Sequence, residues 1–276
     1  MCGAGQVPDE LRSPEALLSG FALQGTIAWI RSRATGNLLP FWLGPELEGV
    51  LQDLRPNEPL PLSVPDSARR VLAAAEILLP EEGTGEYERQ RQERISRTSH
   101  LFRAKGYGPL SDLIHPFHIA ALRRYYRYLI RTGAIRLGDR QSPRRYVAYN
   151  DPVARFFHSD ITTTLSAVAG ESLKPSYVYL ASYLSGAELK QHTDREQCEF
   201  SITLCLDFSP EPELATPWPI RLDTAGGTVT VYQALGDGLA YRGTRLPHYR
   251  DPLCEGQTST SIFFHYVGID FTGSLD

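Results

Sequence analysis

Two stretches decide the fold: Tyr183-Leu-Ser-Gly-Ala-Glu-Leu-Lys-Gln-His192-Thr-Asp194 and Leu246-Pro-His248-Tyr-Arg250, about 55 residues further along. Together they offer two imidazoles and one carboxylate. In an extended strand, residues i and i+2 point to the same side, so His192 and Asp194 can hold one ion from one strand end. His248 must then come from a second strand that packs opposite. Strands distant in sequence face each other in this way across the mouth of a jelly-roll barrel.

The residues before the H-x-D pattern strengthen it, because such a pattern alone is common by chance. Residues 177–183 alternate with the period of two that is typical of a strand, and Gly186 marks a turn. Two histidines and one carboxylate that leave coordination positions open are typical of non-haem Fe(II) sites. The spacing therefore predicts a metal centre at the end of a strand.

A train of strand-like segments, separated by Gly and Pro turns, follows this centre. The segments are residues 200–208, 226–232, 236–241 and 258–267. Many short strands with regular turns are what an antiparallel double-sheet barrel requires. Within the 236–241 segment, Asp237 is expected to serve the tight turn. Period-two counting along the last strand places His265 inward.

From about residue 174 to 270 the chain resembles the catalytic core of 2-oxoglutarate- and Fe(II)-dependent oxygenases of the prolyl-hydroxylase-like branch. The matching pieces are Tyr183-x-x-Gly186, His192-x-Asp194, the Cys198-to-Phe208 strand, Gly226-Gly227, Pro247-His248 and the Ser259-to-Val267 strand. The resemblance implies an α+β fold with a double-stranded β-helix core, jelly-roll and cupin-like, buttressed by helices. It also implies Fe(II), 2-oxoglutarate and O2, with His192, Asp194 and His248 as iron ligands and Tyr183 as a hydrogen-bond partner of the 2-oxoglutarate carboxylate.

One position departs from the family pattern. Such enzymes usually place an Arg or Lys nine or ten residues after the distal histidine, to hold the far carboxylate of the cosubstrate, but here those positions are Gln257 and Thr258. A dianion in a partly dry pocket needs a cation, and a guanidinium binds carboxylate bidentately. Arg250 is the nearest replacement, since it lies two residues after the distal histidine. Ser259 and Ser261 alternate on the last strand and would add hydroxyl donors.

Composition excludes several classes of function. The chain has 276 residues, a net charge of −4 and 42% apolar residues, so neither nucleic acid nor an anionic membrane is an expected partner. No apolar run approaches the roughly 18 residues of a spanning helix. The first residues do not resemble a secretion signal. The four cysteines form no metal or disulfide pattern, which indicates free thiols and a cytoplasmic location.

We expect three parts along the chain: an N-terminal accessory module at 1–85, a charged linker at 86–108, and helices with the oxygenase core at 109–276. A strand at 21–33 and helices at 45–54 and 67–79 indicate a small α/β module of the winged-helix sort. Such a module would bind a peptide or a partner. Alternatively, it is a packing extension that covers one face of the barrel.

Two helical segments precede the barrel. Residues 109–132 show helical spacing from Pro116 onward, and a second helix should begin after Asn150 or Asp151 and end at Gly170. The first helix carries basic and tyrosine residues of the kind that stack on nucleic acid, but an aromatic core face with a solvated basic face explains them. His115 and His118 lack a completing carboxylate or thiol set and are expected to be structural.

The sequence thus predicts an Fe(II)- and 2-oxoglutarate-dependent hydroxylase, acting on an amino-acid residue of a peptide or protein. Three alternatives stay open. The same chemistry could act on a small metabolite, iron and O2 could be used without 2-oxoglutarate, or the barrel could be a non-catalytic binding module. The resemblance does not fix the substrate, because one fold serves many functions. The oligomeric state is not specified.

Overall fold

The computed structural model describes residues 27–31, 38–42, 47, 49–50, 59–74, 78, 84–111 and 113–276. The chain divides into two compact units, Met1–Glu93 and Arg94–Asp276. This division follows the contacts within each unit. The three-part division expected from the sequence stays a prediction.

In the first unit, strands β1 (Ile27–Arg31) and β2 (Leu38–Trp42) pair antiparallel, and helix α3 (Asp66–Ala74) follows. β1 lies within the strand predicted at 21–33, and α3 within the helix predicted at 67–79, apart from Asp66. β2 was not predicted. The helix predicted at 45–54 falls largely outside the described residues, and so does most of the expected winged-helix module.

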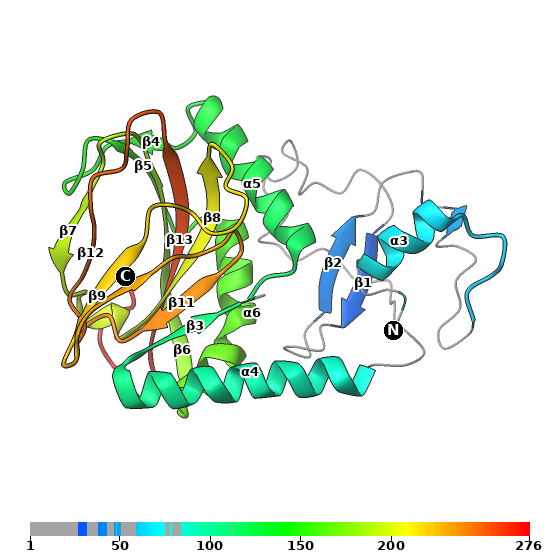
Figure 1. The fold of residues 1–276 in the computed structure, drawn as a ribbon, viewed down its shortest axis with the longest axis horizontal. Helices are drawn as coiled ribbons and strands as arrows, with labels where there is room; N and C mark the ends of the chain where they lie inside the picture. The colour runs from blue at the N-terminus through cyan, green and yellow to red at the C-terminus, as the bar shows by residue number, and fades with distance from the viewer. Residues whose placement is uncertain are drawn as a thin grey trace. The chain divides into compact units, whose positions relative to one another are not determined.

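The second unit contains a jelly roll of eight consecutive strands (Figure 1). They are β6 (Leu173–Tyr183), β7 (Leu189–His192), β8 (Phe200–Ser209), β9 (Ile220–Thr224), β10 (Gly227–Val231), β11 (Gly238–Tyr241), β12 (His248–Arg250) and β13 (Thr258–Gly268). Four of them run in the order β11-β8-β13-β6 in the large sheet, and the other four form a second sheet in the order β10-β9-β12-β7. All paired strands are antiparallel. The double-stranded β-helix predicted from the sequence is therefore confirmed, although β9 was missed.

Three further strands extend the large sheet to seven: β3 (Tyr107–Leu110), β5 (Arg145–Tyr149) and β4 (Arg136–Leu137). β3 corrects the helix predicted from residue 109. Thr98 donates a hydrogen bond to the carbonyl of Pro109 at 2.7 Å, and a Cβ at Gly108 would lie 2.7 Å from the Thr98 methyl. Only glycine allows the preceding helix to pack this closely on the strand.

Helices α5 (Pro116–Arg131) and α6 (Pro152–Ala169) pack on β8 and on β6 and β13. α6 matches the prediction at both ends. The Asp151 carboxylate accepts from the Ala154 N–H at 3.0 Å, and Gly170 closes the helix at φ +76°. His115 caps α5 by accepting from the Phe117 N–H at 3.1 Å, which is a structural role.

Helix α4 (Thr84–Lys105) takes up most of the segment expected to be a charged linker. Its second half belongs to the second unit. There Thr98, Ser99 and Phe102 are buried, and the Phe102 ring stacks on Phe200 of β8 at 6.2 Å. The apolar contacts that end a charged sequence run therefore anchor this helix to the jelly roll.

Alternation along β8 and β13 gives the large sheet an apolar face and a polar face. Phe264 and Tyr266 face α6, where both rings contact His158, at 5.7 and 4.5 Å. Ser261, Phe263 and His265 point the other way, toward the second sheet, as do Ser201 and Thr203 of β8, their register neighbours. The interior between the sheets is accordingly lined with hydroxyl groups.

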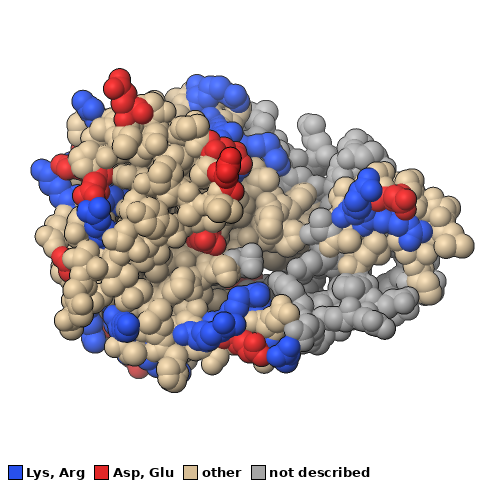
Figure 2. All heavy atoms as spheres, viewed as in Figure 1, with Lys and Arg blue, Asp and Glu red and all other residues tan. Residues whose placement is uncertain are grey.

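On the face shown in Figure 2, basic and acidic side chains are interspersed among larger uncharged areas. Among the described residues, no helix combines the length and the hydropathy that a membrane span needs.

Candidate metal centre

The three predicted ligands meet at β7 and β12, which are neighbouring strands of the second sheet. His192 ends β7, His248 begins β12, and the two histidines are register partners. Asp194 follows two residues after β7. One ligand atom from each of the three lies within 4.8 Å of the others, and the Asp194 Oδ1 is 3.6 Å from the Nε2 of both histidines.

The backbone fixes which nitrogen of each histidine is available. His192 Nδ1 lies 2.8 Å from the Lys190 carbonyl, and His248 Nδ1 lies 3.0 Å from the Leu246 carbonyl. A carbonyl can only accept, so each Nδ1 carries the proton and each Nε2 presents its lone pair. Metal-bound histidines are oriented by this kind of second hydrogen bond.

Asp194 is held in place by one backbone hydrogen bond and one hydroxyl. Its N–H donates to the Gly243 carbonyl at 2.9 Å, and its Oδ2 accepts from the Ser201 hydroxyl at 3.2 Å. Any side chain at Gly243 would collide with the Asp194 carboxylate and the Cys198 carbonyl. Glycine is thus required there, and Oδ1 is left to face the histidines.

The protonation states suit a cation. Burial opposes ionisation of Asp194, but its interactions with His192 and His248 outweigh this and lower the pKa of the carboxyl. Asp194 raises the pKa of His192, whereas burial lowers the pKa of His248. Two imidazole nitrogens and one ionised carboxylate are the donor set of an Fe(II) ion with open coordination positions.

A second group of donors lies on the other side of Asp194. It consists of Asp194, Cys198 and His265. Burial raises the pKa of the Cys198 thiol to about 12, and the thiol hydrogen-bonds Tyr177 at 2.9 Å. His265 Nδ1 pairs with Ser201 at 2.9 Å. A protonated thiol and a paired imidazole make this group a support for Asp194, and His265 points inward as predicted.

Arg250 is a buried cation deep between the sheets. It is 4% exposed and donates to the Trp218 carbonyl at 2.5 Å and to the Gln233 amide oxygen at 3.2 Å. Its Nε has no partner, and no carboxylate among the described residues pairs with it. Burial lowers its pKa, and the groups that oppose this are Cys205, Tyr183 and Tyr241. Burial raises the pKa of each of these three, so none is an anion near neutral pH.

Two hydroxyls near Arg250 are also without partners. They belong to Thr203 of β8 and Ser261 of β13, and both are fully buried on the polar face of the large sheet. Gln233 connects Thr203 to Arg250, because its amide donates to the Thr203 backbone carbonyl at 2.9 Å while accepting from the guanidinium. Ser261 is the register partner of Cys205, which interacts with Arg250. An uncompensated buried cation beside two unsatisfied hydroxyls fits a bound carboxylate.

Arg145 is a second buried arginine that the sequence interpretation missed. It contacts the Tyr183 hydroxyl at 3.4 Å, the predicted cosubstrate partner, but the Asp139 carboxylate neutralises it at 2.5 Å. Interaction with Arg145 helps lower the pKa of Asp139 to about 2, against the opposing effect of burial. Since it already has an anion, Arg145 is a poorer carboxylate anchor than Arg250.

Three further residues singled out in the sequence lie on β13 and in the loops beside the sheets. Ser259 is buried on β13 opposite Tyr183 in the register. Trp218 is buried and donates to the Asp251 carbonyl at 2.6 Å, which pins its loop beside Arg250. Asp237 serves the turn by accepting from the Ala234 N–H at 2.9 Å.

The sequence interpretation missed Ser201, Thr203 and Gln233. A signal existed for the first two, since hydroxyls at 201 and 203 interrupt the apolar run of β8 with period two. Gln233 lies in a loop, and nothing in its surroundings marks it.

Known structures of the same fold were found, all of them distant in sequence. One is the epimerase SnoN from nogalamycin biosynthesis, described as non-haem and α-ketoglutarate-dependent, with 13% identity, 64% of this chain and 84% of that chain covered, and a TM-score of 0.54. Another is a Trichoplax adhaerens prolyl hydroxylase in complex with a peptide of hypoxia-inducible factor, with 11% identity, 67% of this chain and 94% of that chain covered, and a TM-score of 0.53. A third is a Pseudomonas putida prolyl-4-hydroxylase, with 16% identity, 63% of this chain and 100% of that chain covered, and a TM-score of 0.50.

The chain has the fold of the 2-oxoglutarate- and Fe(II)-dependent oxygenases. Neither a protein-family model nor a curated protein matches its sequence. SnoN has also been solved with Fe3+ and α-ketoglutarate bound. At these identities the likeness concerns the fold, so the function has to be argued from the site.

Proposed function

We propose that this chain is an Fe(II)- and 2-oxoglutarate-dependent oxygenase that hydroxylates a C–H bond of an amino-acid residue in a peptide or protein. His192, Asp194 and His248 hold the iron. Arg250 binds the distal carboxylate of 2-oxoglutarate, with Ser261 and Thr203 as hydroxyl donors and Tyr183 and Ser259 lining the same end of the barrel.

When bound, iron and 2-oxoglutarate together activate O2, so that one oxygen atom enters the C–H bond while 2-oxoglutarate becomes succinate and CO2. The chain's own groups orient the reactants. Asp194 and the two Nε2 atoms would hold the metal as three ligands and leave coordination positions open. Arg250 fixes the far end of the cosubstrate, so that its keto-acid end is aimed at the metal.

The observation that carries this proposal is the buried guanidinium of Arg250 without an anion. Burying a charge is costly unless it is paired, and a carboxylate ligand would supply the pair. A 2-oxoglutarate-independent oxygenase would have no use for such a cation. A non-catalytic barrel would need neither this charge nor a complete His-Asp-His set with both Nε2 atoms available.

Anaerobic titration of the Fe(II)-loaded protein with 2-oxoglutarate tests the proposal. We expect the weak visible charge-transfer band of the chelate in the wild type and its absence in His192→Ala. Iron binding without a band would indicate an oxygenase that does not use 2-oxoglutarate. Absence of iron binding in the wild type would overturn the proposal in favour of a binding module.

A second candidate substrate class is a small metabolite. The likeness to SnoN and to the carbocyclase SnoK, both from nogalamycin biosynthesis, favours it. The likeness to two prolyl hydroxylases, one solved with a peptide, favours the peptide. Comparing succinate release with peptide pools and with metabolite pools would separate the two classes.

A further inference from the structure

Arg195 follows the ligand Asp194 directly and is exposed to solvent. Two tyrosines hold its guanidinium. Nη2 donates to the Tyr149 hydroxyl at 2.8 Å, Nε donates to the Tyr177 hydroxyl at 3.2 Å, and Cζ lies 4.5 Å from the centroid of the Tyr177 ring. The two rings stack on each other at 4.8 Å. The guanidinium is therefore oriented before any ligand arrives.

This oriented cation has no counter-charge of its own. Among the described residues, no carboxylate lies within ion-pair distance of Arg195. Both phenols that touch it are neutral, because burial raises the pKa of Tyr149 and of Tyr177. Asp276 acts on Tyr149 and is bonded by Asn150 at 2.9 Å, but it forms no ion pair with Arg195.

Arg195 and Arg250 lie toward opposite ends of strand β6. On β6, Tyr183 lies at the Arg250 end, and Tyr177 precedes it by six residues, or about 20 Å of strand. The Tyr177 ring contacts His265 at 4.6 Å, and His265 is linked through Ser201 to Asp194. The metal centre thus lies between the two arginines.

One end of the interior is accounted for by the cosubstrate. Toward the other end of β6, Arg195 and Tyr149 both lie at the surface, and Tyr149 is 47% exposed. Because Arg195 is bonded to Asp194 through the chain, a substrate group held by this guanidinium would lie close to the proposed metal centre. A carboxylate bound there would gain a charge-assisted hydrogen bond from groups that are already in place.

Building on the proposed function, we propose that Arg195, held by Tyr149 and Tyr177, binds a carboxylate of the primary substrate. The substrate is then an acidic peptide, or an amino acid with a free α-carboxylate, that carries this group close to the reacting carbon. A purely structural Arg195 would only fasten the turn after Asp194 to β5 and β6.

Fluorine NMR with Mn(II) at the metal site and saturating 2-oxoglutarate tests this inference on the full chain. One probe is N-acetyl-aspartyl-4-fluorophenylalanine amide, which carries a side-chain carboxylate. A second is N-acetyl-4-fluorophenylalanine, which carries a free α-carboxylate. The control probe replaces aspartyl with asparaginyl. Mn(II) broadens the fluorine line of a probe that binds beside it.

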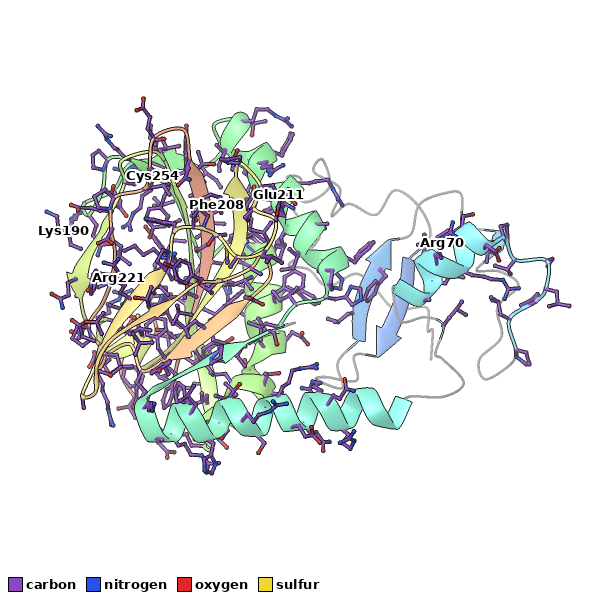
Figure 3. The ribbon with its side chains drawn as sticks, viewed as in Figure 1. Arg70, Lys190, Phe208, Glu211, Arg221 and Cys254 are labelled. Atoms are coloured by element: carbon purple, nitrogen blue, oxygen red, sulfur yellow. The ribbon has the colours of Figure 1, made fainter. Side chains whose placement is uncertain are left out.

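We expect broadening with at least one acidic probe and not with the asparaginyl control. Whichever acidic probe responds identifies the source of the carboxylate. In Arg195→Gln the affinity should fall about 10- to 100-fold, as for loss of a charge-assisted hydrogen bond. Arg195→Lys should keep part of it. Arg221→Gln, which removes a half-buried arginine of β9 paired with Asp251, should leave the affinity unchanged (Figure 3).

Equal broadening by acidic and control probes, or by wild type and Arg195→Gln, would overturn the inference. Metal and 2-oxoglutarate affinities, measured in the same samples by calorimetry, keep the two proposals apart. A wild type that binds neither would fail the proposed function itself, and the inference would fall with it.

Discussion

Single residues decide the chemistry of this barrel, and Arg250 is the clearest case. Most buried residues stabilise the fold by packing, whereas a buried guanidinium without an anion destabilises the free protein. Its retention between the sheets is explained by a ligand. The resemblance to known oxygenases indicates a missing cation, and the sequence suggests Arg250 as its replacement, a role that we propose for it above.

Replacing Arg250 with Met should separate stability from ligand binding. The free energy of unfolding of the ligand-free protein should stay the same or rise by up to about 1–2 kcal/mol, because an unpaired buried charge is removed. The affinity for 2-oxoglutarate should fall about 100-fold, and Fe(II) binding should stay nearly intact. Calorimetry with each ligand checks this. Unchanged cosubstrate affinity would place the anchor elsewhere, with Arg145 the next candidate.

Ser201 contacts the proposed metal ligand Asp194 and is not itself one of the proposed ligands. Its hydroxyl lies between Asp194 Oδ2 and His265 Nδ1. Ser201→Ala should therefore weaken Fe(II) or Mn(II) binding about 10- to 100-fold, as for other outer partners of metal ligands. The affinity for 2-oxoglutarate in the metal-saturated protein should stay the same.

Ser182→Ala is the matched control for this change. Ser182 lies on the opposite face of the same sheet and accepts a hydrogen bond from Thr260 at 2.8 Å. The two variants should lose similar stability in denaturant unfolding. If both lowered the metal affinity equally, the effect of Ser201 would be a general consequence of weakening the sheet.

At the scale of elements, α6 and the strands with regular alternation followed from the sequence, because caps and period two are local signals. The short strands did not. β9 is a short strand that follows a Pro-rich loop. β3 falls at the start of a segment predicted to be helical, because its pairing with β11, far along the chain, leaves no signal in the local sequence. Local signals likewise identify His192 and His248 as candidate ligands, whereas Gln233 lies in a loop and has no such signal.

The start of α6 is a junction of two helices. Asp151 caps α6 and also accepts from the hydroxyls of Tyr125 and Tyr126 of α5, at 2.8 and 2.9 Å. Asp151→Ala leaves two buried phenols unsatisfied and removes a cap, so we expect a loss of about 3–5 kcal/mol in the free energy of unfolding. Thr163→Ala, at an exposed position of the same helix, should cost almost nothing. Chemical denaturation would measure both, and equal losses would contradict this role.

At the scale of the whole molecule, buried neutral histidines make stability depend on pH. Burial lowers the pKa of His158 to about 3 and of His265 to about 4. In the unfolded chain both should titrate near 6.5. Between these values the unfolded chain binds protons that the folded chain does not. Stability is therefore complete above about pH 6.5 and falls as the pH is lowered toward 4.

Denaturant unfolding of the metal-free protein at pH 7, 6 and 5 would measure this dependence. The slope of the free energy of unfolding against pH should correspond to the uptake of nearly one proton per histidine on unfolding. His158→Gln should remove about half of this slope. A pH-independent midpoint over this range would show that the two rings are not kept neutral by the fold.

The short strand β12 carries His248 at one end and Arg250 at the other. A proposed iron ligand and a proposed cosubstrate anchor are thus separated by one residue of a single strand, with a register shift between them. Such a strand acts as a ruler: it admits a keto acid of one chain length, and neither end can be displaced without the other. A homologue one carbon longer or shorter, such as 2-oxoadipate or oxaloacetate, should be a poor substitute, and adapting the protein to it would require rebuilding this strand rather than exchanging one side chain.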